Sequence, residues 1–141
     1  MYKRIISWFL VILWMAVIYS FSAESGETSG GKSQKITKSI QFIIDKTPLK
    51  GKVQWTDFAT RKTGHVSEYL ILTLLVYNAL TQSGFKKRNR ILLALLVPLV
   101  YASLDEFHQS FIAGRGPSVR DVLIDGIGIL LGAGMSSIRK R

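Results

Sequence analysis

The sequence predicts an all-α, polytopic membrane protein in which four spanning helices form one bundle. Three observations predict this class. The 141 residues are 48% hydrophobic with a positive mean hydropathy, although the formal net charge is +10. The apolar residues gather in four segments, and a spanning helix needs about 20 such residues. Most basic residues lie outside these segments, as expected when charges occupy the loops of a membrane protein.

The composition also limits the class of protein. The length predicts a single domain over residues 1–141. A pI near 10 would suit a nucleic-acid binder, but no stretch interleaves basic and aromatic residues, so we expect no nucleic-acid partner. The chain has no cysteine, which excludes disulfides, thiol nucleophiles and thiolate metal sites.

The first apolar segment, residues 5–23, carries no charge and follows Lys3 and Arg4. It is long enough to cross a bilayer as an α-helix. A cleavable signal peptide is the alternative, because small residues at Ser20–Ala23 are typical of a cleavage site. The uninterrupted length favours a spanning helix.

The second and third segments are too short to span unless ionisable residues are included. Tyr69–Leu80 reaches spanning length only when extended to residues 64–82, which places His65 and Glu68 inside the helix. Ile91–Leu104 likewise requires residues 91–110. That extension brings in Asp105, Glu106 and His108. Pro98 lies in this third span, where neighbouring helices can accommodate it.

The fourth span is expected over residues 119–138. It follows Pro117 and begins at Ser118-x-x-Asp121, a pattern typical of a helix N-terminus. Asp121 and Asp125 share a helical face with Gly128 and Gly132, whose spacing lets another helix approach closely.

The loop between the first two spans contains a further predicted helix. Gly26–Ser33 is rich in Gly and Ser and is expected to be flexible. Beyond it, Ile36, Ile40, Ile43 and Ile44 recur at helical spacing among lysines, which predicts an amphipathic helix ending at Thr47–Pro48. We expect this helix to lie on the outer headgroups, the alternative being that it packs on the ends of the spans.

The basic residues predict the orientation. Lys3, Arg4, the "KKRNR" loop at 86–90 and the "RKR" end at 139–141 provide nine basic residues and no acidic one. Four spans would place all of them on one side, which is cytoplasmic by the positive-inside rule. The long first loop also carries eight basic residues, but long loops count for less. We therefore expect a multi-pass membrane protein with both termini cytoplasmic.

This threading places three groups of ionisable residues at the extracytoplasmic ends of the spans. Charges in a bilayer are costly and are usually paired or functional, so a shared polar site is expected there. The catalytic candidates are His65, Asp105, Glu106 and His108. The candidates for substrate binding are Lys62, Glu68, Tyr69, Tyr101, Gln109, Arg115, Arg120, Asp121 and Asp125.

Three chemistries fit these residues. Lys62, Arg115 and Arg120 could bind phosphate while a histidine transfers a proton. Alternatively, Asp105, Glu106, His108 and Asp125 could bind a divalent cation, although their spacing matches no named metal motif. Lastly, the groups could satisfy one another as a network without chemistry.

Several candidates also have an ordinary structural interpretation. Lys62 and Arg120 at helix ends could extend to the headgroups. Asp121 could only cap its helix. Tyr69 and Tyr101 could anchor the spans at the membrane interface.

Three stretches resemble the VanZ family of membrane proteins: "RKTGHVSEYLILTLL" (Arg61–Leu75), "YASLDEFHQSFIAGR" (Tyr101–Arg115) and "DVLIDGIGILLG" (Asp121–Gly132). "VIYSFSAES" (Val17–Ser25) resembles the end of the family's first helix. The family often has Asn at the position of Asp125, so a polar contact fits that position better than a charged ligand. The resemblance implies a small multispanning bacterial protein linked to low-level teicoplanin resistance.

These patterns and the resemblance lead to three functional hypotheses. The first is an envelope enzyme, a hydrolase or transferase, acting at the outer leaflet on a phosphate-bearing, lipid-linked or cell-wall precursor. The second is a non-catalytic protein that binds such a precursor or the glycopeptide. The third is a structural membrane protein whose charges pair internally. In every case the lipid bilayer is the expected environment.

Overall fold

All regular secondary structure in the described part of the chain is α-helical, which confirms the all-α part of the prediction. The computed structural model describes residues 1–116 and 118–138. Its helices are α1 (Tyr2–Ser22), α2 (Gly26–Ile44), α3 (Asp57–Gln82), α4 (Lys87–Gln109) and α5 (Val119–Ile138). Of these, α1, α4 and α5 are long and apolar enough to cross a membrane. Pro117 and the basic residues at 139–141 lie outside the described residues.

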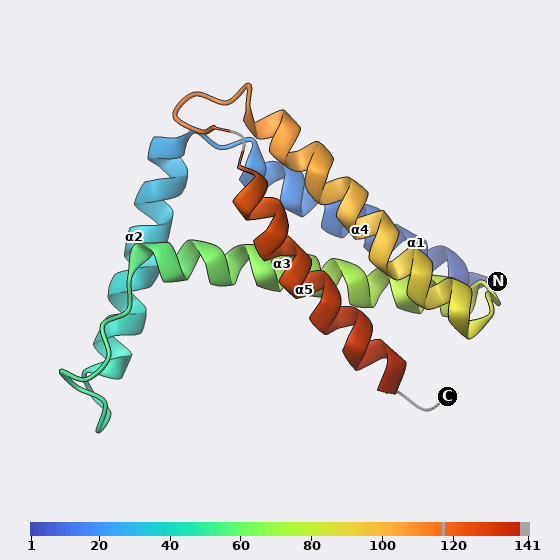
Figure 1. The fold of residues 1–141 in the computed structure, drawn as a ribbon, viewed down its shortest axis with the longest axis horizontal. Coiled ribbons are helices and arrows are strands. Elements are labelled where there is room, and N and C mark those ends of the chain that lie inside the picture. The colour runs from blue at the N-terminus through green and yellow to red at the C-terminus, as the bar shows by residue number, and fades with distance from the viewer. Residues whose placement is uncertain (117, 139–141) are drawn as a thin grey trace.

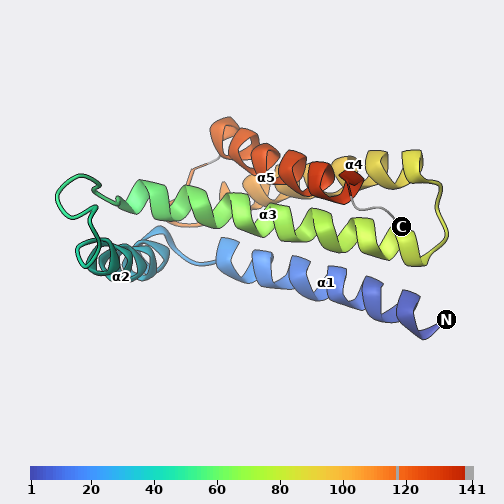
Figure 2. The same cartoon turned by 90° about the horizontal axis from the view of Figure 1, so that it is seen from below.

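The helices α1, α3, α4 and α5 run alternately up and down and form one bundle (Figures 1 and 2). The N-terminus, the α3–α4 loop and the last turn of α5 lie at one end. At the other end, α2 crosses the bundle at a steep angle to α3 (Figure 1). The α4–α5 loop also lies at this end, so the connections near α2 are brought together.

Helix α3 is the central helix of the bundle. It packs against α1, α4 and α5, and most extensively against α5. Its second half is buried, from Tyr69 to Leu80 on the inner side. α3 starts seven residues before the predicted span at 64–82, because the Thr56 hydroxyl accepts a hydrogen bond from the Ala59 amide at 3.1 Å and caps the helix. The polar first half keeps α3 outside the group of helices that qualify as spans by composition.

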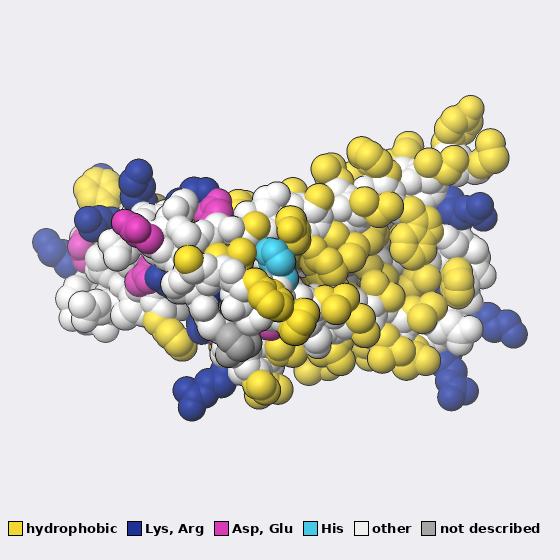
Figure 3. All heavy atoms as spheres, turned by 90° about the horizontal axis from the view of Figure 1, so that it is seen from above, with side chains coloured by type: hydrophobic (Ala, Val, Ile, Leu, Met, Phe, Trp, Pro, Cys, Tyr) yellow, Lys and Arg dark blue, Asp and Glu magenta, His cyan; other side chains and the backbone are white. Residues whose placement is uncertain are grey.

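The other three bundle helices carry the surface that suits lipid. Large apolar side chains on their outer sides are exposed, among them Phe9, Leu99 and Leu130. Figure 3 shows hydrophobic side chains covering this part of the molecule, while acidic side chains gather toward the end that carries α2. α4 begins four residues before the predicted span and continues through the buried Pro98. An exposed apolar belt on several helices is typical of a multi-pass membrane protein.

The prediction that Gly26–Ser33 is flexible is wrong, because these residues form the first two turns of α2. Ser25 caps the helix by accepting a hydrogen bond from the Thr28 amide, and Glu27 carries a negative charge in the first turn. Gly26 lies directly against the α4–α5 loop, and its amide donates to the Ala113 carbonyl at 3.1 Å. These local contacts offset the low helical propensity of the glycines.

Helix α2 packs on α3 through small and polar residues. Ser33 donates a hydrogen bond to Asp57, and the hydroxyls of Thr37 and Thr60 lie 2.6 Å apart. Ile36 and Ile43, by contrast, are more than half exposed. Of the four isoleucines that predicted this helix, Ile36 and Ile43 are therefore on a side that α3 does not cover, whereas Ile40 and Ile44 are half-buried.

Two glycines of α5 permit its close contact with α3. A Cβ atom on Gly128 would lie 2.2 Å from the Val66 carbonyl oxygen, and one on Gly132 would lie 2.9 Å from the Leu70 carbonyl oxygen. No side chain fits between these two backbones. The two predicted glycines thus set the distance between α3 and α5.

Replacing Gly128 with Ala should separate α3 from α5, because the new methyl group cannot fit against the α3 backbone. We expect Gly128→Ala to lower the free energy of unfolding by about 1–3 kcal/mol. Gly134→Ala is the matched control, since nothing lies within 4 Å of a Cβ at that position of the same helix. Thermal unfolding in a mild detergent measures both variants, and equal stability for the two would contradict the close contact.

Candidate functional site

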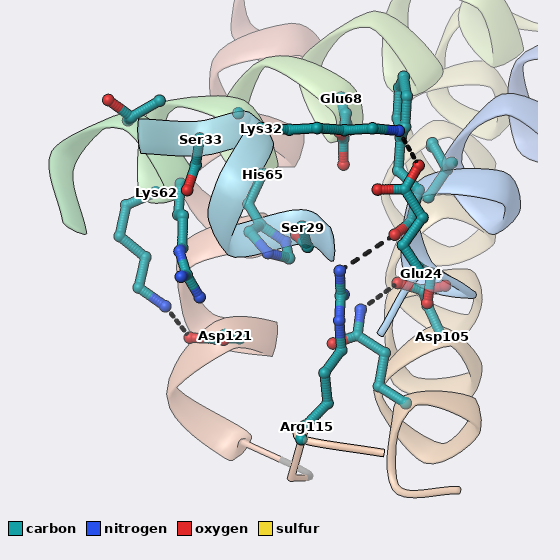
Figure 4. Close-up of a pocket in the computed structure, with 18 of the residues that line it drawn as sticks. Glu24, Ser29, Lys32, Ser33, Lys62, His65, Glu68, Asp105, Arg115 and Asp121 are labelled. Carbon is teal, nitrogen blue, oxygen red and sulfur yellow. Dashed lines mark hydrogen bonds and ion pairs between the residues drawn. The ribbon is translucent and has the colours of Figure 1, made fainter. Parts of the chain in front are cut away.

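A pocket of about 440 Å³ lies at the end of the bundle that α2 crosses (Figure 4). Its walls come from the end of α1, the first halves of α2 and α3, the end of α4, the α4–α5 loop and the first turn of α5. Among the predicted site residues, the structure brings seven to its lining: Lys62, His65, Glu68, Asp105, Gln109, Arg115 and Asp121. Pockets of this size commonly hold a small ligand or a headgroup.

One part of the pocket lining is polar and buried. Asp105 and Gln109 stand one turn apart on α4, and the Gln109 amide donates to the Asp105 carboxylate at 3.1 Å. Ser22, at the end of α1, is only 3% exposed, and its hydroxyl has no hydrogen-bond partner among the described residues. A buried hydroxyl without a partner is costly, so this position is suited to a polar ligand group.

His65 is held by a carboxylate behind the pocket wall. Its Nδ1 atom lies 3.1 Å from Oδ1 of Asp125, which is 1% exposed. An acidic partner at Nδ1 favours a proton on that nitrogen and leaves Nε2 as the atom that can accept one. The sequence assigned Asp125 to substrate binding, whereas the structure places it behind His65, in contact with the ring.

Three ion pairs surround the mouth of the pocket. Lys62 of α3 pairs with Asp121 of α5, and Lys32 pairs with Glu24. Within α3, the Arg61 guanidinium lies 3.0 Å from Asp57. Because these side chains are partly exposed, each pair contributes at most about 1 kcal/mol to stability. Their main effect is to cancel most of the charge at the mouth.

Three charged residues of the pocket, Arg115, Glu68 and Asp105, have no ionic partner among the described residues. Arg115 donates from Nη2 to the Phe21 carbonyl oxygen at 3.1 Å, and it reaches the pocket from the α4–α5 loop (Figure 4). The Glu68 carboxylate accepts no hydrogen bond within the described part of the chain, and it lies within electrostatic range of His65, Asp105 and Arg115. These groups remain available to a ligand.

Two of the four catalytic candidates lie outside the pocket lining. Glu106 is buried and accepts a hydrogen bond from the Ser118 amide at 3.0 Å, so it holds the start of α5. His108 packs against Tyr19, with the ring centroids 4.7 Å apart. Successive residues of a helix point about 100° apart, so Glu106 cannot share the direction of Asp105.

Three binding candidates also lie elsewhere. Tyr69 is fully buried in the bundle, and its hydroxyl has no hydrogen-bond partner among the described residues. The Tyr101 hydroxyl donates to the Met15 carbonyl oxygen at 2.6 Å and ties α4 to α1. Arg120 is exposed and does not line the pocket.

The alternative of a divalent cation finds no support in the geometry. Asp105, Glu106, His108 and Asp125 are divided between the pocket floor, the start of α5, the Tyr19 contact and the His65 contact. Within residues 1–116 and 118–138, no group of three or more His, Asp or Glu side chains is arranged to hold a metal ion.

The sequence did not single out the contribution of α1 and α2 to the pocket. Ser22, Glu24, Ser29, Lys32 and Ser33 all line it. They belong to the end of the first span and to the segment expected to be flexible. The Ser-rich stretch at 17–25 was noticed only through the family resemblance, and nothing in its spacing indicated a site.

Comparison with known proteins identifies a family. The profile of the VanZ/LLP1 family matches residues 7–140, which is nearly the whole chain. Searches of curated proteins and of solved structures gave no match.

Removing the Asp125 carboxylate should destabilise the protein more than removing that of Asp121. Asp125→Ala leaves a buried imidazole without its partner, which should cost about 1–3 kcal/mol. Asp121→Ala breaks a partly exposed pair and should cost about 1 kcal/mol or less. Thermal unfolding of both variants and of Asp125→Asn, which retains an acceptor, checks the order. A larger loss for Asp121→Ala would contradict the assigned role of Asp125.

Proposed function

Since the chain belongs to the VanZ/LLP1 family and is a multi-pass membrane protein, we propose that it acts on a phosphate-bearing, lipid-linked substrate of the cell envelope. The observation that carries the proposal is the polar pocket at one end of a lipid-exposed bundle, with His65 backed by Asp125. A lipid could enter there from the membrane side while its headgroup occupies the polar lining.

The proposed chemistry is phosphoryl-ester hydrolysis or transfer, with His65 as the general base. Nε2 of His65 takes the proton of an attacking water or hydroxyl, and Asp125 stabilises the imidazolium that forms. The attacking oxygen bonds to phosphorus, and the bond to the leaving oxygen breaks. The leaving oxygen then takes up the proton. In this proposal Arg115, which has no ionic partner among the described residues, binds phosphate oxygens.

A non-catalytic binding protein is the second candidate. It is favoured by the ion pairs at the mouth, because Lys32, Arg61 and Lys62 are already matched by carboxylates. In this case the pocket would hold a precursor headgroup or part of a glycopeptide without converting it. The resemblance to VanZ also leads us to propose that the chain lowers sensitivity to teicoplanin, through either mechanism.

We further propose that α3 crosses the membrane in addition to α1, α4 and α5, and that the pocket faces the outside of the cell. The basic residues Lys3, Arg4 and those at 86–90 lie at the end opposite the pocket, which supports a cytoplasmic location for that end. α2 would then lie along the outer headgroups, since it crosses the bundle end and leaves Ile36 and Ile43 exposed.

Replacing His65 with Gln should abolish turnover. Loss of a general base typically lowers the rate by 10²–10⁴-fold. The assay follows phosphate or headgroup release from polyprenyl-phosphate, phospholipid and lipid-linked wall-precursor substrates in nanodiscs. In cells, the same variant should lose any protection against teicoplanin. His108→Gln is the comparison, because His108 packs on Tyr19 outside the pocket. Loss confined to His108→Gln would refute the assignment.

The proposed orientation can be tested directly because the chain has no cysteine of its own. A single cysteine at Lys50, in the α2–α3 connection, should react with a membrane-impermeant maleimide added to intact cells. A single cysteine at Arg88, at the start of α4, should react only after the membrane is permeabilised. The opposite labelling pattern would invert the proposed topology.

A further inference from the structure

We infer that the pocket selects a zwitterionic lipid headgroup in which a primary ammonium lies close to a phosphate, as in ethanolamine phospholipids. This inference rests on the proposed function, because it presumes that the pocket receives a phosphate-bearing lipid. It adds the identity of the headgroup, which follows from the charges left uncompensated around the pocket.

The charged residues of the pocket lining do not favour a simple anion. The lining contains four basic residues, Lys32, Arg61, Lys62 and Arg115, and four acidic ones, Glu24, Glu68, Asp105 and Asp121. The three lysine and arginine side chains at the mouth are paired with carboxylates. What remains is one guanidinium, Arg115, and two carboxylates, Glu68 and Asp105. A ligand that complements these charges carries both signs.

The two remaining carboxylates and Ser22 form the part of the site that suits an ammonium group. One oxygen of Asp105 accepts from Gln109. The Ser22 hydroxyl is buried in the same lining beside the Asp105 carboxylate, and it makes no hydrogen bond of good geometry within the described part of the chain. Three acceptors with free capacity match the three N–H donors of a primary ammonium.

Arg115 supplies the anion-binding part of the site. It uses one of its five donors on the Phe21 carbonyl oxygen, so the rest of the guanidinium can bind phosphate. Because Phe21 and Ser22 are consecutive residues of α1, the phosphate and ammonium positions are neighbours. A headgroup whose phosphate and ammonium are joined by a short linker fits two neighbouring positions.

The apolar part of the lining provides a route for the acyl chains. Ile18, Phe21 and Ile36 line the pocket, and the last two are 49% and 52% exposed. They belong to the end of α1 and to α2, so a lipid bound with its headgroup inside can leave its chains along these helices. A free, water-soluble zwitterion would gain nothing from this apolar edge.

Other common headgroups satisfy the pocket less well. A choline headgroup has no N–H donor and cannot bond to Glu68, Asp105 or Ser22. A glycerol headgroup has donors but no positive charge, so it leaves the charges of Glu68 and Asp105 uncompensated.

The test measures phospholipid binding to the purified full chain. Native mass spectrometry or competition in nanodiscs compares phosphatidylethanolamine, phosphatidylcholine and phosphatidylglycerol. We expect about a tenfold preference for phosphatidylethanolamine, equivalent to about 1.4 kcal/mol. Asp105→Asn with Glu68→Gln should remove the preference. Arg115→Gln should weaken the binding of all three lipids alike. Asp45→Asn, Glu27→Gln and Arg88→Gln are exposed charge-neutralising controls that should retain the preference.

The wild-type comparison is decisive whether or not the variants fold. Equal binding of the three lipids, or a preference that survives Asp105→Asn with Glu68→Gln, overturns the inference. If free phosphoethanolamine competes for the pocket as well as the lipid does, the role given to the apolar lining residues Ile18, Phe21 and Ile36 is overturned. Selective binding without turnover of any substrate supports the headgroup assignment and argues against catalysis. Turnover without a headgroup preference supports the proposed catalysis and overturns the headgroup assignment.

Discussion

The close contact between α3 and α5 is the constraint on which the rest of the structure depends. The first half of α3 carries Lys62, His65 and Glu68, and such groups are costly next to lipid. They are acceptable where a neighbouring helix supplies opposite charges and water can enter. α5 does so through Asp121 and Asp125, and it reaches α3 because Gly128 and Gly132 present no side chain to the α3 backbone. Without this contact α3 could not occupy the centre of the bundle.

The pocket follows from the same arrangement. Once α3 and α5 are joined, α4 adds Asp105 and Gln109, the end of α1 adds Ser22, and the α4–α5 loop adds Arg115. α2 encloses the site because its own small residues let it lie against both α3 and that loop. The ion pairs at the mouth then cancel charge locally, and unmatched charges remain deeper in the site. Binding and chemistry are therefore proposed for the interior and not for the mouth.

Hydrophobicity and charge spacing predicted much of this from the sequence. The fourth span agrees with α5 residue for residue, and extending the second and third spans for length correctly placed His65, Glu68 and Asp105 in helices. The predictions that failed concern features that depend on contacts between distant segments. The Gly- and Ser-rich start of α2 is helical because Ser25 caps it and Gly26 packs on the α4–α5 loop. Helical spacing separates Glu106 from Asp105, but the rotation of α4 in the bundle decides that Asp105 faces the pocket while His108 does not, and the sequence pattern does not give that rotation.

The most direct measurement of the central contact is cross-linking between α3 and α5 in native membranes. The cysteine-free chain allows a cysteine pair at Lys62 and Asp121, whose side chains form an ion pair in the structure. A short bifunctional thiol reagent should join them rapidly and nearly completely, whereas a pair at Lys62 and Arg88, at opposite ends of the bundle, should remain unlinked. If the first pair stays unlinked, or both pairs react equally, α3 and α5 do not meet as described, and the pocket loses its basis.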